Sequence, residues 1–172
     1  RNSEMNDYEY SETPGNDMTR ATTNCLYLID CRKEEVIEKL HEEFKELILA
    51  GLYLLLDNTA NKIYIGESSN ISERLKQHIK KIDIPDFKFD RILLVWDGRP
   101  VSTSHFGDEA LRKSLEKECI KLFKNISSKF QSVNTVEKPK ETNFQVRSSS
   151  NRITKELNFL LYKYHLLDTL QD

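Results

Sequence analysis

The chain has 172 residues, enough for one domain with extensions and a single hydrophobic core. Its hydrophobic content of 38% is typical of a globular domain, and it has no apolar run of about 18 residues that could cross a membrane. A formal net charge of −2 excludes a protein that coats nucleic acid through its overall charge alone.

The three cysteines predict reduced thiols in a cytoplasmic protein. Cys25, Cys31 and Cys119 cannot all pair with one another, and their spacing matches no zinc pattern. No basic region followed by an apolar stretch opens the chain, so no signal peptide is expected. Because the first residue is Arg1 rather than Met, a trimmed chain or a piece of a longer protein remains open.

The first fifty residues predict an arm followed by a helical extension. Residues 1–20 are polar, acidic and without apolar periodicity, which indicates a flexible acidic arm. Within the extension, residues 21–50, a short strand or extended segment is expected at 26–29. An amphipathic helix is expected at 33–49, where apolar residues recur at helical spacing: Val36, Ile37, Leu40, Phe44, Leu47 and Ile48.

A β-hairpin followed by a helix is predicted next. Residues 52–56 and 62–66 are short apolar strands joined by a turn-forming segment. A helix begins after Ser68, Ser69 or Asn70, any of which can cap it, and buries the side that carries Ile71, Leu75, His78 and Ile79.

The remaining elements are one strand and two helices. Residues 91–96 are apolar enough for a central strand, and residues 107–124 read as a helix with Asp108 as its cap. Residues 125–150 are polar and loop-like. A last amphipathic helix begins at about Arg152 and is expected to pack on the domain, within a C-terminal region of residues 137–172.

Two tyrosines, an arginine and a histidine are expected to lie close together. Alternation along the hairpin strands can bring Tyr53 and Tyr64 to one surface. Arg74 and His78, four residues apart, share one face of the following helix. A guanidinium there could bind a phosphate and an imidazole could move a proton, although packed aromatics and a solvated arginine explain the same residues.

A carboxylate and a basic stripe add to this cluster. Glu116 lies at the edge of the apolar face of the 107–124 helix, where it is either a ligand for a hard metal ion or an ordinary surface acid. Residues 74–81 contain no acid, and their cations could contact DNA phosphates: Arg74, Lys76, Lys80 and Lys81.

Five sequence elements occur in the order of the GIY-YIG nuclease signature, which residues 50–136 resemble. The first triplet has Leu where the family has Ile. The elements are Gly51-Leu52-Tyr53, Tyr64-Ile65-Gly66, Arg74 with His78, Leu115-Glu116, and Asn134. The resemblance implies a compact α+β domain at residues 51–136, with a small three-stranded antiparallel sheet flanked by helices and with extra N- and C-terminal helices.

The resemblance also implies hydrolysis of DNA phosphodiester bonds with one divalent metal, Mg²⁺ or Mn²⁺. Glu116 would hold the metal and Arg74 would stabilise the scissile phosphate. Tyr53 and Tyr64 would position or deprotonate the attacking water, with Tyr53 as the preferred base, and His78 would assist proton transfer. Asn134 would shape the site, with Asn125 as its competitor for that position.

Two other functions stay open from the sequence. One is a nucleic-acid-binding module that keeps the fold without cutting. The other is a protein-interaction domain whose contacts are the helices at residues 33–49 and 152–167, and a homodimer through either helix fits all of these functions. The sequence does not define DNA specificity, nicking against double-strand cleavage, or biological role.

Overall fold

The computed structural model describes residues 8–15, 18–34, 49–80, 87–134 and 143–171. Within these ranges, no helix combines the length and apolar character needed to span a bilayer.

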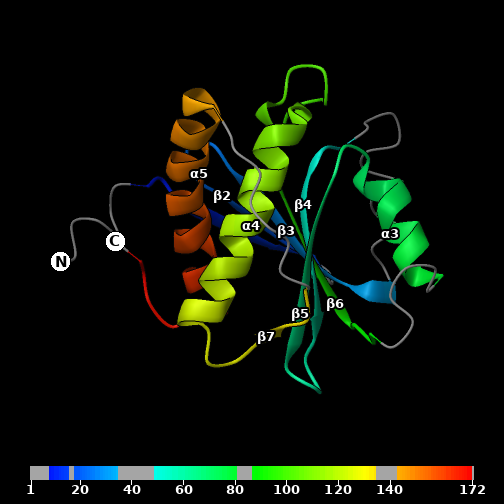
Figure 1. The fold of residues 1–172 in the computed structure, drawn as a ribbon. Helices are drawn as coiled ribbons and strands as arrows, with labels where there is room; N and C mark the ends of the chain where they lie inside the picture. The colour runs from blue at the N-terminus through cyan, green and yellow to red at the C-terminus, as the bar shows by residue number, and fades with distance from the viewer. Residues whose placement is uncertain (1–7, 16–17, 35–48, 81–86, 135–142, 172) are drawn as a thin grey trace.

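A mixed sheet forms the centre of the structure (Figure 1). Its strands lie in the order β1-β2-β3-β6-β4-β5-β7, and every neighbouring pair is antiparallel except β5 and β7. The strand bounds are β1 Ser11–Gly15, β2 Met18–Thr22, β3 Tyr27–Arg32, β4 Gly51–Asp57, β5 Lys62–Ser68, β6 Arg91–Trp96 and β7 Gln131–Ser132.

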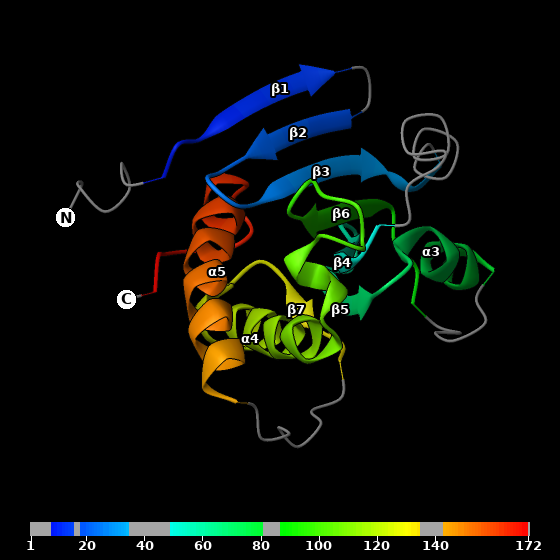
Figure 2. The same ribbon diagram turned by 90° about the horizontal axis from the view of Figure 1, so that it is seen from above.

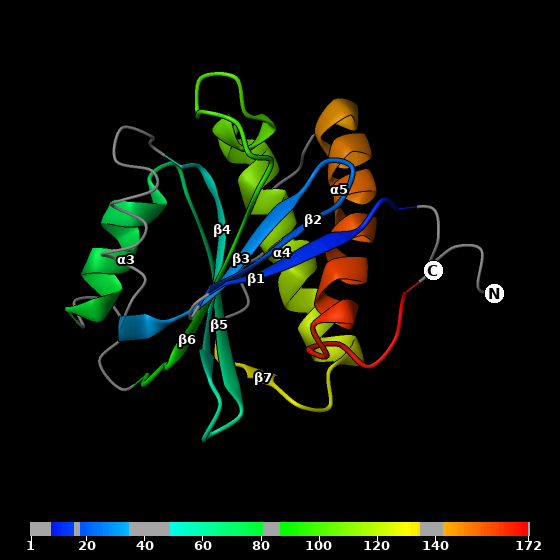
Figure 3. The ribbon, with the colours of Figure 1, turned by 180° about the vertical axis from the view of Figure 1, so that it is seen from behind.

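Helices cover both faces of this sheet. Helices α4 (Glu109–Ile126) and α5 (Phe144–Lys163) pack against each other on one face, and α3 (Ile71–Ile79) lies on the other. The view from behind shows the same arrangement (Figure 3). A short 3₁₀ turn, His105–Gly107, leads into α4. The central strands β4 and β6 are buried almost throughout, as strands covered on both faces must be.

The prediction of a small three-stranded sheet is wrong, although the α+β class holds. The structure contains a seven-stranded mixed sheet, because β1, β2 and β3 extend the predicted core through pairing of β3 with β6, and β7 adds a parallel strand beside β5. β1 and β2 occupy part of the predicted flexible arm. All five residues of β1 are exposed, so this strand is formed by pairing with β2 and not by an apolar pattern of its own.

The predicted helices near the chain ends also need revision. The amphipathic helix expected at residues 33–49 falls almost entirely outside the described residues. The described residues 21–34 of the predicted helical extension contain the end of β2 and all of β3.

Helix α5 begins at Phe144 rather than near residue 152. The Asn143 side chain caps it by accepting from the backbone N of Val146 at 2.8 Å. The predicted loop therefore ends earlier than expected, and its serine run is helical. Ser150 is buried and its hydroxyl lies 2.8 Å from the hydroxyl of Ser114 on α4, which explains how a polar residue is accommodated between the two helices.

The elements that carry the predicted site are confirmed. β4 and β5 form an antiparallel hairpin, and α3 begins after Asn70, whose side chain accepts from the backbone N of Glu73. Asp108 caps α4 by accepting from the backbone N of Ala110 at 2.9 Å. Each of these elements has a local signal, a turn or a cap, in addition to its apolar pattern.

Cys25 and the buried carboxylate of Glu156 give a prediction about alkaline stability. The Cys25 thiol donates to Glu156 Oε2 at 2.6 Å, and burial together with this carboxylate raises the pKa of Cys25 from 9.0 to about 12. As the pH rises, the Cys25 thiol ionises in the unfolded chain before it ionises in the folded protein. The neutral thiol therefore contributes fully to the free energy of unfolding below pH 9, and this contribution is lost as the pH rises from 9 toward 12.

Cys25→Ser removes this titration and keeps a hydroxyl donor for Glu156. We expect the urea midpoint of the wild type to fall more steeply between pH 8.5 and about 10.5 than that of Cys25→Ser. Equal slopes for the two proteins would contradict this assignment.

Candidate active site

The hairpin β4–β5 places Tyr53 and Tyr64 on the face of the sheet that α3 covers. Tyr53 lies opposite Gly66 and Leu55 lies opposite Tyr64, so alternation directs both phenols to one side. Their ring centroids are 6.3 Å apart. The sequence-based expectation that the two tyrosines share a surface is therefore met by the register of the hairpin.

Helix α3 brings His78 and Arg74 to the Tyr53 hydroxyl. The His78 Nε2 atom lies 3.0 Å from this oxygen, and Arg74 Nε donates to it at 3.3 Å. Arg74 also donates through Nη1 to Gln77 Oε1 at 2.8 Å. The Tyr53 oxygen accepts from Arg74, and it either donates to His78 Nε2 or accepts from it, according to the tautomer of the imidazole.

Tyr64 completes the aromatic cluster. Its ring centroid lies 5.4 Å from that of His78 and 6.5 Å from that of Phe87. Tyr64 is half-buried, whereas Tyr53 and His78 are almost fully buried. Tyr64 is therefore the more accessible of the two phenols.

Glu116 joins the cluster from α4, the helix on the other face. Helix α4 packs against β5, and the view from above shows β5 lying between α3 and α4 (Figure 2). The half-buried Glu116 carboxylate lies close enough to raise the pKa of both Tyr53 and Tyr64. The structure thus brings together residues that are 63 positions apart, from Tyr53 to Glu116, around one strand.

The pKa values of the two phenols are set by groups that act in opposite directions. Burial is the main reason that the pKa of Tyr53 lies above its ordinary value; the charges of Tyr64 and Glu116 raise it further, and Arg74 lowers it. Burial also raises the pKa of Tyr64, Glu116 adds to this, and Arg74 and the Tyr53 hydroxyl lower it. Both side chains are therefore neutral phenols at neutral pH.

The Asn134 side chain binds the backbone of β5 at Ile65. Its Oδ1 accepts from the backbone N of Ile65 at 2.9 Å, and its Nδ2 donates to the carbonyl of Ile65 at 2.7 Å. The side chain thus continues the pairing of β7 along β5, which favours a role in holding the strand. The competing Asn125 is exposed near the end of α4.

Gly66 is needed because the Tyr53 ring lies over it. A Cβ atom at this position would come within 2.1 Å of Tyr53 Cζ and 2.2 Å of its hydroxyl oxygen. The second glycine of the signature therefore leaves room for the phenol that His78 and Arg74 bind.

Gly66→Ala is expected to displace Tyr53 and to abolish any activity of the cluster, with a cost to stability of about 1–3 kcal/mol from overpacking. Tyrosine fluorescence and urea unfolding would measure the displacement and the stability. Gly15→Ala, at a hairpin end where the added Cβ meets only a carbonyl at 3.0 Å, is the matched control. A fully active Gly66→Ala protein would contradict this role.

The predicted DNA-binding cations differ in exposure. Lys76 and Lys80 are exposed on or directly after α3, whereas Arg74 is half-buried beside Tyr53. Lys81 lies outside the described residues.

The donor set suits a single hard cation bound by one carboxylate. No group of three or more His, Cys, Asp or Glu side chains in the described ranges could hold a metal ion. Mg²⁺ commonly uses one or two carboxylates and completes its coordination with water and substrate phosphate. Glu116, a half-buried carboxylate whose charge acts on both phenols, fits that mode.

Sequence reasoning missed the ion pair between Glu67 and Arg112. Arg112 Nε donates to Glu67 Oε2 at 2.7 Å and joins α4 to the end of β5. Glu67 directly follows Gly66, but nothing in the local pattern indicates a partner 45 positions away.

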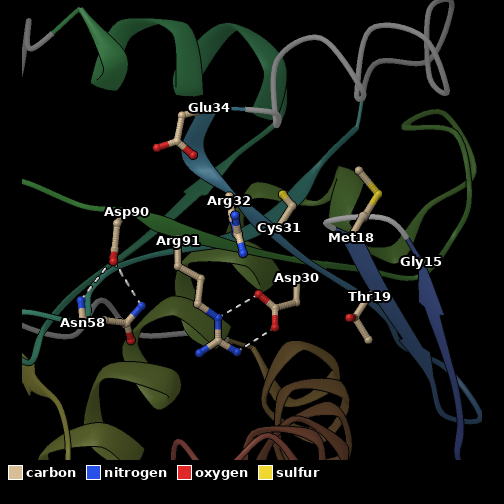
Figure 4. Close-up of a pocket in the computed structure, with 10 residues that line it drawn as sticks. All are labelled: Gly15, Met18, Thr19, Asp30, Cys31, Arg32, Glu34, Asn58, Asp90 and Arg91. Carbon is tan, nitrogen blue, oxygen red and sulfur yellow. Dashed lines mark hydrogen bonds and ion pairs between the residues drawn. The ribbon is translucent and has the colours of Figure 1, made fainter.

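A separate polar pocket of about 560 Å³ lies away from the tyrosine cluster (Figure 4). The bidentate pair of Arg91 with Asp30, at 2.8 and 2.6 Å, and the contact of Asn58 with Asp90 occupy much of its lining. None of the predicted site residues lines it.

The described part of the chain is thus an α+β domain in which two tyrosines, an arginine and a histidine gather beside one hairpin. Residues 49–131 match the family model of the GIY-YIG catalytic domain, the family that the sequence resembles. The match confirms the resemblance and includes every predicted site residue except Asn134. No match was found among curated proteins or among solved structures.

Proposed function

We propose that this protein is a divalent-metal-dependent endonuclease that hydrolyses DNA phosphodiester bonds. The observation that carries the proposal is the pair of contacts to the Tyr53 hydroxyl, from His78 at 3.0 Å and from Arg74 at 3.3 Å, together with the Glu116 charge that acts on the same phenol. A packing tyrosine needs neither a guanidinium nor an imidazole at its hydroxyl, whereas phosphoryl chemistry needs a cation and a proton acceptor at one point.

Tyr53 and His78 act as a proton relay. As water attacks the phosphorus, its proton passes to the Tyr53 oxygen while the phenolic hydrogen passes to Nε2 of His78. Because the phenol exchanges one proton for another, it need not exist as a phenolate beforehand. This route suits a tyrosine whose pKa is held above its ordinary value by burial.

Arg74 and Glu116 supply the charges around the phosphate. The Arg74 guanidinium stabilises the negative charge that develops on the phosphate oxygens. Glu116 would hold the metal ion, which, when bound, polarises the phosphate and lowers the pKa of a bound water. Tyr64, the more accessible phenol, orients the attacking water, and Asn134 fixes the backbone of the strand that carries Tyr64.

Exposed lysines on α3 provide DNA affinity. Lys76 and Lys80 belong to the same helix as Arg74 and His78, so DNA phosphates that they bind would flank the scissile one. We propose the same contact for Lys81.

Replacing Lys76 and Lys80 together by alanine is expected to weaken DNA binding and to lower the slope of log affinity against log salt by about 2. Fluorescence anisotropy with a labelled duplex between roughly 50 and 200 mM salt would measure this slope. Lys113→Ala, which removes an exposed lysine paired with Glu109 on α4, is the control. An unchanged slope in the double variant would remove these lysines from the DNA contact.

The proposed activity is tested by incubating the purified protein with supercoiled plasmid, branched DNA and RNA in Mg²⁺, Mn²⁺ or EDTA. Metal-dependent nicking or cleavage of DNA supports the proposal. Binding that EDTA does not change, with no products on any substrate, would instead identify a nucleic-acid-binding module on the same fold.

A further inference from the structure

Two nitrogen atoms of the Arg74 guanidinium donate to side chains of two different elements. Nε donates to the Tyr53 hydroxyl on β4 at 3.3 Å, and Nη1 donates to Oε1 of Gln77 on α3 at 2.8 Å. A guanidinium is planar, so contacts at two of its nitrogens fix both the position and the plane of the group. Gln77 is not among the residues of the five sequence elements that resemble the nuclease signature.

The chemistry of the second contact fixes the orientation of the Gln77 amide. A guanidinium has donors and no acceptor, so the amide must present its oxygen to Arg74 and not its nitrogen. Gln77 is half-buried and follows Arg74 by three residues, so the two side chains are neighbours on α3. Because the acceptor is an amide, it holds the guanidinium without adding a negative charge of its own.

The orientation of this guanidinium matters for the proposed reaction. Arginine binds a phosphate through a rigid fork of N–H groups, so the plane of the fork must match the phosphate oxygens. A misplacement of about 1 Å in the catalytic geometry can lower a rate by about 100-fold. The contact of Arg74 with Tyr53, at 3.3 Å, is long for a hydrogen bond, and the shorter contact is the one with Gln77.

We propose that Gln77 is a positioning residue that fixes the orientation in which the Arg74 guanidinium meets the scissile phosphate. The inference rests on the proposed function, because it assigns Arg74 to the stabilisation of that phosphate. It requires only the contact between Gln77 and Arg74 and holds whatever else the guanidinium binds. A polar contact between neighbours on a helix would otherwise affect only the stability of the helix, and only slightly.

Gln77→Ala is expected to lower the rate of plasmid nicking at saturating DNA by about 10- to 100-fold. DNA affinity, measured by fluorescence anisotropy, should stay within about 3-fold of wild type, because the proposal assigns affinity to the exposed lysines. Alanine is a better helix former than glutamine, so a weakened α3 would not explain the loss.

A double-mutant cycle shows whether Gln77 acts through Arg74. In an Arg74→Met background, which keeps an aliphatic side chain and removes the guanidinium, Gln77→Ala should change the nicking rate by less than about 2-fold. A role that does not involve Arg74 would give the same loss in both backgrounds. Thermal unfolding of each variant shows whether it is folded. If nicking in the Arg74→Met background is below detection, the order of the guanidinium decides.

The order of the guanidinium can be measured by NMR without any cleavage. A guanidinium that is held gives separate signals for Nη1 and Nη2, and rotation about the bond between Nε and Cζ merges them. We expect separate signals for Arg74 in the wild type, identified by their absence in Arg74→Met, and merged signals in Gln77→Ala. Gln77→Glu, which keeps an oxygen acceptor, should keep the signals separate.

Glu118→Ala is the matched control. Glu118 also contacts a residue three positions away on the surface of a helix, Lys121 on α4, at 3.6 Å. We expect this substitution to leave both the nicking rate and the Arg74 signals unchanged.

Three results would overturn the inference. Separate signals in Gln77→Ala would show that Gln77 does not hold the guanidinium, whether or not the protein cleaves DNA. An unchanged nicking rate in Gln77→Ala, or an equal loss in the Arg74→Met background, would show that the contact does not serve the reaction. All three leave the nuclease proposal standing if wild type nicks DNA and Glu116→Ala does not. A wild type that nicks no DNA would overturn the proposed function, and the role of Gln77 at a phosphate with it.

Discussion

Glu116→Ala is expected to lower metal-dependent DNA cleavage by about 1000-fold or more, while the protein stays folded. The proposal gives the metal a single protein carboxylate, so its removal takes away both the ion and the charge stabilisation at the phosphate. The side chain is half-buried at the edge of the apolar face, so its loss should cost little stability. Plasmid nicking rates at saturating Mg²⁺, with unfolding curves for each protein, measure both effects.

Glu118→Ala is the matched control for this result. Glu118 lies on the same helix and forms an ion pair with Lys121 at 3.6 Å, away from the tyrosines. We expect it to keep wild-type activity. Equal losses in the two variants would indicate a general effect of acidic residues on α4, and full activity in Glu116→Ala would remove this residue from the site.

Tyr53→Phe is expected to lower the cleavage rate by about 100- to 10,000-fold, the range for losing a positioned acid or base. Phenylalanine keeps the ring that lies over Gly66 and removes only the hydroxyl that contacts His78 and Arg74. DNA affinity should stay near that of the wild type, because binding depends on the exposed lysines. Single-turnover rates and anisotropy separate the two quantities. Tyr27→Phe, at a 46% exposed tyrosine of β3, is the control.

The pH dependence of the cleavage rate distinguishes the proton relay from catalysis by a preformed Tyr53 phenolate. Burial raises the pKa of Tyr53, so the fraction of phenolate stays small through neutral and mildly alkaline pH. The relay uses the neutral phenol and predicts a rate that is level between about pH 7.5 and 9. A rate that instead rises about tenfold per pH unit over this range would favour the phenolate and contradict the relay.

Local signals made the central part of the fold predictable. The hairpin has two apolar strands and a turn of polar residues, and its register follows from that turn. Asn70 and Asp108 mark the first residues of α3 and α4 through their capping side chains. Since Tyr53, Tyr64, Arg74 and His78 all lie on these elements, most of the cluster could be expected from the sequence.

The outer part of the sheet could not be predicted because its stability is not local. β1 is wholly exposed and includes Pro14, and its strand character arises from pairing with β2. Likewise, the early start of α5 depends on the Asn143 cap and on the contact of Ser150 with Ser114, a residue 36 positions away.

Contacts around the site between segments that are distant in the sequence could not be predicted from local sequence patterns either. The bonds of Asn134 to the backbone of Ile65 span 69 positions, and the Glu67–Arg112 pair spans 45. Neither pairing leaves a periodic pattern in the sequence. The family signature pointed to Asn134 and Glu116, but only the packing of α4 against β5 explains how Glu116 reaches the tyrosines.

The most direct test of metal-dependent DNA hydrolysis at this cluster is the initial rate of supercoiled plasmid nicking by the wild-type protein as a function of free Mg²⁺. We predict no nicking in EDTA, recovery when Mg²⁺ is restored, and a rate that saturates with the metal concentration, as for one bound ion. Nicking that proceeds equally in EDTA, or intact plasmid at every Mg²⁺ and Mn²⁺ concentration, would contradict it.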